Sequence, residues 1–162
     1  MRLRRYRTED LPILARLFGE TVRQVNCRDY TLPQVEAWAA GEADLLTRDS
    51  WFQRLYTLVA EAGGRIVGYG NVMLTVESNP RRRHTGGLGI MVRTDCQGQG
   101  IAAALCDALE AHCRELGVDA VTVHASKTAL PFFLGRGYAI EREQQVPCRG
   151  QVLTNYALEK IL

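Results

Sequence analysis

Residues 93–105, RTDCQGQGIAAAL, place two glycines and two glutamines within four positions and then become small and apolar. Hydrophobic residues precede this stretch at Leu88, Ile90 and Val92, and the apolar pattern after it continues to Leu116. The pattern predicts a tight turn between a strand and a helix, because glycine adopts backbone conformations that other residues avoid. Glycines also let a ligand approach the backbone closely. This turn is therefore the first candidate for a binding site.

The helix predicted over residues 98–116 begins inside the glycine-rich stretch. The first N–H groups of a helix have no partner within it and carry a partial positive charge, which suits a phosphate or another anion. The stretch is not a P-loop, because the pattern GxxxxGK[ST] is absent. The dinucleotide pattern GxGxxG fails at its third glycine, where Ala103 stands, and three predicted strands run consecutively before the motif. That order argues against repeated βαβ units.

The remaining periodicity predicts a mixed chain with one strand–helix–strand crossover at residues 86–125. Thr8 is the predicted N-cap of the first helix, Ser50 caps a later one, and residues 40–50 are predicted to be a polar loop. Predicted strands cover residues 2–6, 56–61, 66–76, 86–92, 120–125, 138–146 and 151–158, and predicted helices cover 8–25, 31–38, 50–55, 98–116 and 128–136. The fold class is therefore α+β, in one domain over residues 1–162.

Composition excludes several classes of protein. A net charge of +2 is too small for a typical nucleic-acid-binding domain. No apolar run approaches the length of a membrane span, and the N-terminal residues lack the apolar core of a signal peptide. Five cysteines form no C-x-x-C pair and no disulfide framework, which favours a reducing cytoplasm. The three histidines show no metal-ligand spacing, so no metal site is expected.

Two motifs resemble those of one family. Gln97-x-x-Gly100-x-Ala102 resembles the (Gln/Arg)-x-x-Gly-x-(Gly/Ala) motif of the GNAT superfamily, the acyl-CoA-dependent N-acetyltransferases. SKTALPFFLGRGY, residues 126–138, resembles the family's Asn-x-x-Ala-x-x-Phe-Tyr-x-x-x-Gly-Phe stretch, which it fits at Ala129, Phe132, Gly137 and Tyr138. Residues 29–38 also resemble an uncharacterised bacterial subgroup. The predicted order of elements matches the family's fold, a mostly antiparallel sheet flanked by helices with one β-α-β crossover that binds acetyl-CoA.

The resemblance implies a site and a reaction. The pyrophosphate of acetyl-CoA, the co-substrate, would lie on backbone amides of Gln97, Gly98, Gln99, Gly100, Ile101 and Ala102. The pantetheine arm would run beside Ile90, Met91 and Val92, and the amide of Val92 or of a neighbour would face the thioester oxygen. A backbone N–H aimed at developing oxyanion charge is a standard device for acyl transfer. An amine would attack the thioester directly, with no covalent enzyme intermediate.

The chain departs from the family pattern at two positions. Ser126 stands where the family often has Asn, and Phe133 stands where the usual tyrosine would donate a proton to the leaving thiolate. A thiol has an ordinary pKa of about 8.5, so a thiolate leaves tolerably near neutral pH without help. General acid catalysis is typically worth about 10²–10⁴-fold. Ser126 or water would have to replace the tyrosine, and Phe133 belongs either to the core or to the wall of the thioester pocket.

An ammonium acceptor must also lose a proton. Glu77 and His84, in the predicted loop between two strands, are the candidate bases, and Asp29 and Tyr30 are candidates for facing the acceptor. The basic run at residues 81–83 is interpreted as a solvated turn, with attraction of an acidic acceptor as the alternative. His124, on a predicted strand, is interpreted as an ordinary strand residue.

Three functions are compatible with these residues. The first is an N-acetyltransferase acting on a primary amine of a small molecule, a peptide or a protein. The second is an acyl-CoA-binding regulatory protein with little or no turnover, which Phe133 favours. The third is a toxin-like enzyme that acetylates aminoacyl-tRNA, supported only by the basic run, although the small net charge argues against nucleic acid. A homodimer is the expected assembly, because it is the commonest soluble oligomer.

Overall fold

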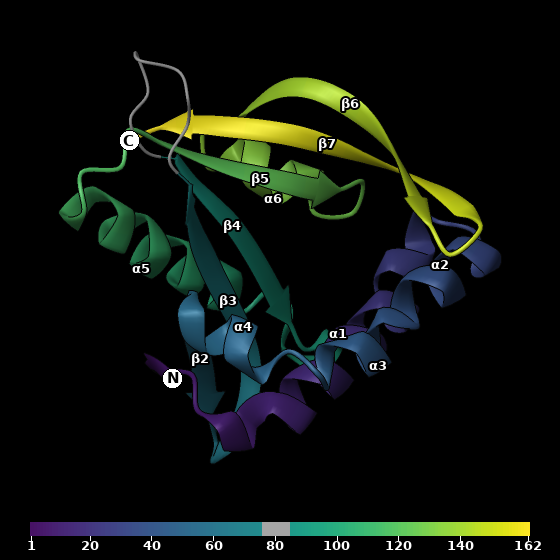
Figure 1. Cartoon of the computed structure of the whole chain (residues 1–162), viewed down its shortest axis with the longest axis horizontal. Helices are drawn as coiled ribbons and strands as arrows, with labels where there is room; N and C mark the ends of the chain where they lie inside the picture. The colour runs from purple at the N-terminus through teal and green to yellow at the C-terminus, as the bar shows by residue number, and fades with distance from the viewer. Residues whose placement is uncertain (76–84) are drawn as a thin grey trace.

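The computed structural model describes residues 1–75 and 85–162 (Figure 1). Its strands are β1 (Arg2–Arg5), β2 (Tyr56–Ala62), β3 (Arg65–Thr75), β4 (Thr85–Val92), β5 (Ala120–Ser126), β6 (Ala139–Cys148) and β7 (Gln151–Ile161). Its α-helices are α1 (Leu11–Gln24), α2 (Leu32–Ala39), α3 (Gly41–Leu45), α4 (Asp49–Arg54), α5 (Ile101–Glu115) and α6 (Leu130–Gly135). Three 3₁₀ turns complete the described elements, η1 (Thr8–Asp10), η2 (Asn26–Arg28) and η3 (Thr94–Cys96).

The strands form one seven-stranded sheet in the order β1-β2-β3-β4-β5-β7-β6. Within the described residues β4 and β5 are the parallel pair, and every other neighbouring pair is antiparallel. Parallel neighbours need a crossover connection, and α5 provides it. The sheet is therefore mixed and mostly antiparallel with one β-α-β unit, which confirms the predicted fold class.

The two faces of the sheet pack against different helices. On β2, Leu58 and Ala60 belong to the core under α5, whereas Val59 between them belongs to the core under α1 and α4. This alternation follows from the two-residue period of a strand. The helix α5 supplies its side of the core through an apolar stripe at a spacing of about four residues, made of Ile101, Leu105 and Leu109.

Glycine on β3 lets α5 approach the sheet closely. A Cβ added at Gly70 would lie 3.0 Å from Leu109 Cδ1 and 3.1 Å from the carbonyl oxygen of Gly89. A larger residue at this position would push the helix away, and the helix carries the glycine-rich turn at its start.

A charged cluster is buried between α5 and the C-terminal strands. Glu110 of α5 is 2% exposed and accepts hydrogen bonds from Lys160 Nζ at 2.7 Å and from the Tyr138 hydroxyl at 3.0 Å. Arg114 and the thiol of Cys106 donate two longer bonds to the same carboxylate. Burial by itself would raise the pKa of Glu110, but the bonds from Lys160 and Tyr138 outweigh burial and hold the pKa of this carboxyl below its usual range.

Local predictions had mixed outcomes. The hairpin turn between β2 and β3 is confirmed, because Gly63 and Gly64 both have positive φ in a two-residue loop. The predicted loop at residues 40–50 is wrong, because it contains α3 and the start of α4. The caps predicted at Thr8 and Ser50 are also wrong, since Thr8 lies within η1 and Ser50 lies inside α4. The long α5 was placed correctly, but it begins at Ile101 rather than at Gly98.

Candidate active site

The glycine-rich turn lies between η3 and the start of α5. Gly98 and Gly100 have φ values of 72° and 78°, a conformation in which a side chain is strained. A Cβ added at either glycine would meet nothing within 4 Å, so the space above the turn is open. Residues 97–100 are exposed, and Gly100 is the N-cap of α5. Exposed backbone at the N-terminus of a fifteen-residue helix is suited to an anion.

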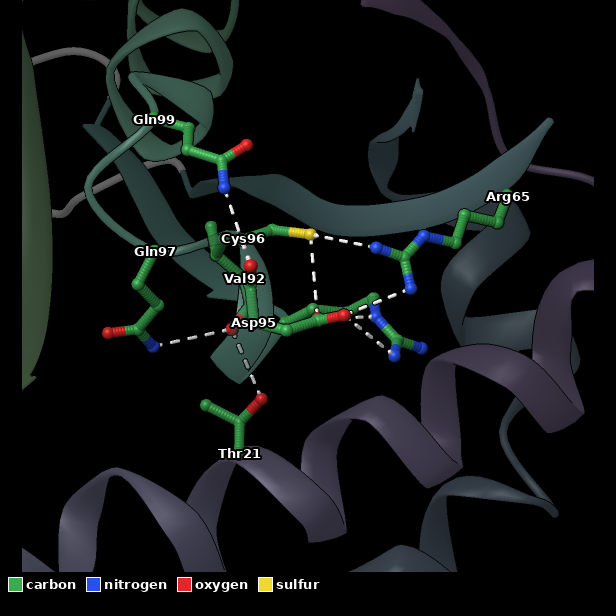
Figure 2. Close-up of polar contacts among 8 residues, drawn as sticks. Thr21, Arg65, Val92, Asp95, Cys96, Gln97 and Gln99 are labelled. Atoms are coloured by element: carbon green, nitrogen blue, oxygen red, sulfur yellow. Dashed lines mark hydrogen bonds and ion pairs between the residues drawn. The ribbon is translucent and has the colours of Figure 1, made fainter. Parts of the chain in front are cut away.

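Side chains of helix α1 and of the turn itself make hydrogen bonds at the end of β4 and just after it (Figure 2). The carbonyl oxygen of Val92 accepts hydrogen bonds from Thr21 Oγ1 at 3.2 Å and from Gln97 Nε2 at 3.5 Å. Gln99 Nε2 donates to the carbonyl oxygen of Asp95 at 3.3 Å. The turn is thus tied both to β4 and, through Thr21, to helix α1.

Asp95 beside the turn is neutralised by two arginines (Figure 2). Arg93 Nε lies 3.0 Å and Arg65 Nη1 lies 2.9 Å from its carboxylate oxygens. The hydrogen bond from Arg93, together with the bond from Arg65, holds the pKa of Asp95 well below its usual range. A paired carboxylate repels an approaching phosphate less than an isolated one, so these arginines keep the turn suitable for an anion.

The strands β4 and β5 separate where they approach the turn (Figure 1). They pair from Thr85 with Ala120 to Leu88 with Val123, after which β4 continues beside β3 and β5 continues beside β7. The N–H of Arg93 donates to the carbonyl of Val67, next to β3. Because N–H groups alternate sides along an antiparallel strand, those of Ile90 and Val92 face the edge that β5 has left.

One cavity of about 630 Å³ joins the glycine turn to this open edge. The predicted cofactor-binding residues that line it are Ile90, Met91, Val92, Gln97, Gly98, Gly100, Ile101 and Ala102. Gln99 lies on the same turn, but its side chain bonds to Asp95 and it is not among the described residues that line the cavity. The structure therefore brings eight of the nine predicted cofactor-binding residues together around one space of a size typical of ligand sites.

Ser126 and Phe133 both line the cavity. Ser126 Oγ accepts bonds from Asn26 Nδ2 at 3.3 Å and from the Ala129 amide at 3.1 Å, which leaves its own proton for a third partner. Phe133 is 4% exposed and packs edge-on against Tyr138 at 5.3 Å between ring centroids. The two interpretations of Phe133 therefore hold together, since it belongs to the core and also forms part of the cavity wall.

The other predicted site residues have different outcomes. Tyr30 does not line the cavity, because its hydroxyl donates to the carbonyl of Thr154 at 2.6 Å and accepts from an amide at 2.9 Å. Asp29 is exposed and accepts a bond from Thr128 Oγ1 at 2.7 Å. Glu77, His84 and the basic run at residues 81–83 lie outside the described residues. Among residues 1–75 and 85–162, no cluster of His, Cys, Asp and Glu could hold a metal ion.

His124 lines the cavity, although its sequence context indicated an ordinary strand residue. It is exposed and follows Val123, the last β5 residue that pairs with β4. The signal that could have found it is its position four residues after the expected start, at Ala120, of a strand that borders the turn. Strand separation, however, is a property of the sheet and is not visible in the strand's own sequence.

No helix in the described part of the chain is long and apolar enough to cross a membrane. All five cysteines are unpaired.

Comparison with known proteins identifies relatives along nearly the whole chain. A family model described as an acetyltransferase (GNAT) domain matches residues 27–160. The uncharacterized N-acetyltransferase YafP of Escherichia coli strain K12 is 28% identical over 159 residues, which cover 96% of this chain and 93% of that protein.

Solved structures agree with these matches. The structure of a GCN5-related N-acetyltransferase (aminotransferase, class II) from Rhodopseudomonas palustris has a TM-score of 0.88 at 29% identity, covering 99% of this chain and 95% of that one. A GNAT superfamily phosphinothricin acetyltransferase from Sinorhizobium meliloti, solved in complex with acetyl-CoA, has the same fold, with a TM-score of 0.73 at 20% identity. It is covered over 88% of its length, against 99% of this chain.

Proposed function

Because the chain belongs to the GNAT family of acetyltransferases, we propose that it moves an acetyl group from acetyl-CoA to a primary amine by direct attack. The observation that carries the proposal is the single cavity that connects the glycine turn with the open edge of β4. A long cofactor with an anionic end and a reactive end needs both features in one continuous space. The acetyl-CoA bound by the Sinorhizobium meliloti neighbour supports the choice of cofactor.

The pyrophosphate of acetyl-CoA would bind the backbone of residues 97–102. The positive φ of Gly98 and Gly100 exposes this backbone, and the absence of Cβ atoms leaves room for the phosphates. The helix dipole of α5 would favour negative charge at this point. Binding would therefore depend on backbone groups more than on charged side chains.

The pantetheine arm would extend beside β4 in the gap left by β5. The N–H groups of Ile90 and Val92 face that gap, and Thr21 donates a hydrogen bond to the carbonyl of Val92, in the next peptide unit. In this arrangement the Val92 N–H would point at the thioester oxygen and stabilise the charge that develops when the amine attacks. The tetrahedral intermediate would then expel CoA as a thiolate.

Two proton transfers remain to be assigned. Phe133 has no proton to donate, so we assign protonation of the departing thiolate to Ser126, whose hydroxyl proton is unused by its other two bonds, or to water. We assign removal of the amine's proton to His124, because histidine is the side chain that most often accepts protons near neutral pH and this one lines the cavity. Glu77 and His84 stay predicted candidates for the same role.

The alternative function is an acyl-CoA-binding regulatory protein with little turnover. The burial of Phe133 at the position of the family's tyrosine is the observation that favours it. The two functions predict the same cofactor binding and differ only in whether CoA is released when an amine is added.

Isothermal titration of the full chain with acetyl-CoA, CoA and NAD tests the cofactor site. Gly100→Glu would place a bulky anion where we place the pyrophosphate, and we expect it to weaken acetyl-CoA binding by about 100-fold. Gly117→Glu is the matched control, because Gly117 at the other end of α5 also has positive φ, 68°, and open space above it. No binding of either CoA species by the folded native chain would overturn the cofactor assignment.

Three broader expectations stay proposals. We propose that residues 1–162 form one acetyltransferase domain, that it works in the cytoplasm, and that it is a homodimer. Five unpaired cysteines support the second of these, because reducing compartments keep thiols free. Light scattering of the purified chain would measure the third.

A further inference from the structure

The part of the cavity that is lined by α1, α2, α4, β3 and β5, which we call the acceptor end, carries no formal charge from the part of the chain that the structure describes. None of its lining residues there is Asp, Glu, Lys or Arg. Asp29, a carboxylate that accepts a hydrogen bond from the lining residue Thr128, is exposed and does not itself line the cavity. Arg23 of α1 pairs with Glu42 at 3.3 Å. A charged group on a bound acceptor, apart from the reacting amine, would therefore find no described charged partner on the cavity wall.

Aromatic rings from several elements form the wall of this end. Phe18 of α1 and Trp38 of α2 contact edge-on, with ring centroids 6.4 Å apart. On the neighbouring side, Phe52 of α4 contacts Trp51 at 5.0 Å and Tyr69 of β3 at 6.0 Å. All five rings line the cavity. Such a wall gains most from a ligand that buries apolar or aromatic surface against it.

The aromatic wall is continuous with the proposed reaction centre. Met91 of β4 packs against the core of Phe52 and Tyr69 and also against the core that contains Val22 and Tyr30. Its neighbours on the strand, Ile90 and Val92, direct their N–H groups into the gap between β4 and β5, which we call the thioester channel. Two of the polar lining residues, His124 and Ser126, belong to β5 on the opposite side of that channel. An acceptor can therefore place an apolar body on the aromatic wall and its amine between β4 and β5.

We propose that the acceptor is a primary monoamine with an aromatic or other apolar body and without a carboxylate or a second ammonium group. This inference rests on the proposed function, because it concerns the same cavity. Burying an unpaired charge is costly, so amino acids and polyamines are disfavoured relative to arylalkylamines of similar size. Aromatic rings can also hold cations, and a polyamine is therefore the informative competitor.

Tryptophan fluorescence gives a direct test, because both tryptophans of the chain, Trp38 and Trp51, line the cavity. The full chain, saturated with CoA, is titrated with phenethylamine, phenylalaninamide, phenylalanine and spermidine. We expect saturable quenching with the first two amines, and a Kd for phenylalanine at least about 30-fold higher, because only phenylalanine carries a carboxylate. Equal or tighter binding of phenylalanine or spermidine, or no binding of phenethylamine, would overturn the inference.

Release of CoA from acetyl-CoA, measured with the same amines, separates this inference from the proposed function. Binding of phenethylamine without CoA release would contradict the proposed acetyl transfer, but it would support the proposed chemical class of the bound amine. CoA release with spermidine but not with phenethylamine would support acetyl transfer and overturn the proposed class of amine.

A pair of variants tests the cavity itself. Leu45 lines the cavity, whereas the adjacent Leu46 is 50% exposed and does not. We expect Leu45→Glu to raise the Kd for phenethylamine about tenfold and to introduce spermidine binding, because the wall then carries a carboxylate. Leu46→Glu is the matched control and should change neither Kd. The same response in both variants, or none in Leu45→Glu with its circular dichroism unchanged, would contradict the proposed class.

Discussion

The molecule holds polar groups in its interior in two different ways. In the Glu110 cluster, a buried carboxylate is surrounded by Lys160, Tyr138, Arg114 and Cys106, and its two oxygens are occupied. In the cavity, the described lining carries no fixed charge, and the backbone N–H groups of Ile90 and Val92 face the edge that β5 has left. In the Glu110 cluster the carboxylate already has its hydrogen-bond partners within the protein, whereas the cavity leaves backbone N–H donors for a ligand.

This difference separates stability from function. A buried charge contributes to a folded protein only when its partners are complete, because removing one partner leaves the other unpaired. A binding site needs the reverse, since groups that are already paired cannot hold a ligand. Changes in the Glu110 cluster should therefore alter the free energy of unfolding without altering acetyl-CoA affinity, and changes in the cavity lining should alter binding or turnover.

The largest expected effect is on turnover. We expect His124→Gln to lower kcat by about 100-fold, because an assigned proton acceptor is lost, while the Kd for acetyl-CoA is unchanged. Steady-state assays of CoA release, with the amine that the native chain acetylates fastest, would measure kcat. His112→Gln is the control, since His112 stacks on Tyr56 at 3.5 Å between ring centroids and does not line this cavity. A kcat within threefold of the native value would remove His124 from the mechanism.

The next effect is on stability. We expect Lys160→Met to lower the free energy of unfolding by about 2 kcal/mol, because Glu110 would keep only the weaker, half-exposed Arg114 as a cationic partner. Arg114→Met should cost below about 1 kcal/mol, since an exposed ion pair contributes little. Urea unfolding measures both, and titration with acetyl-CoA should give the native Kd in each. A larger loss for Arg114→Met would contradict the assigned roles.

The two ends of the cavity differ in how much of their lining the sequence indicated. The cofactor end is local, because a contiguous turn with Gly98 and Gly100 displays its own backbone, and the motif carries that information. The acceptor end is assembled from side chains of α1, α2, α4, β3 and β5, and no short pattern encodes their meeting. The sheet strands were predictable for the same reason as the turn, since a two-residue period is local.

The errors also have physical causes. The short helix α3 was missed because its five residues, GEADL, bury no side chain fully and show no apolar stripe. Thr8 was assigned as a cap from its residue type, but Asp10 makes the bidentate bonds to Arg4 that fix this corner, at 2.7 and 2.8 Å. The place of His124 in the cavity lining was not foreseen, because it follows from the separation of β4 and β5.

Phe133→Tyr would convert part of the cavity wall into a proton donor. We expect kcat to rise by up to about tenfold, since general acid assistance would be added to a leaving group that already departs without it. Steady-state kinetics with saturating acetyl-CoA would measure the change. Turnover that appears only in this variant would favour the regulatory protein over the enzyme for the native chain.

The smallest effect is the pH dependence of the Glu110 cluster. The folded state holds the pKa of Glu110 below its usual range, so the unfolded chain binds the proton first as the solution is acidified. The stability from Glu110 is therefore complete above the ordinary glutamate pKa of about 4.3 and is lost as the pH falls through the folded-state pKa. The native chain's free energy of unfolding in urea should exceed that of Glu110→Gln by an amount that shrinks as the pH falls from about 5 to about 3. Asp10, whose carboxyl pKa is also lowered by Arg4 despite burial, is present in both proteins and cancels in the difference. An advantage that grew on acidification would mean that burial, rather than the surrounding donors, sets the protonation of this carboxyl.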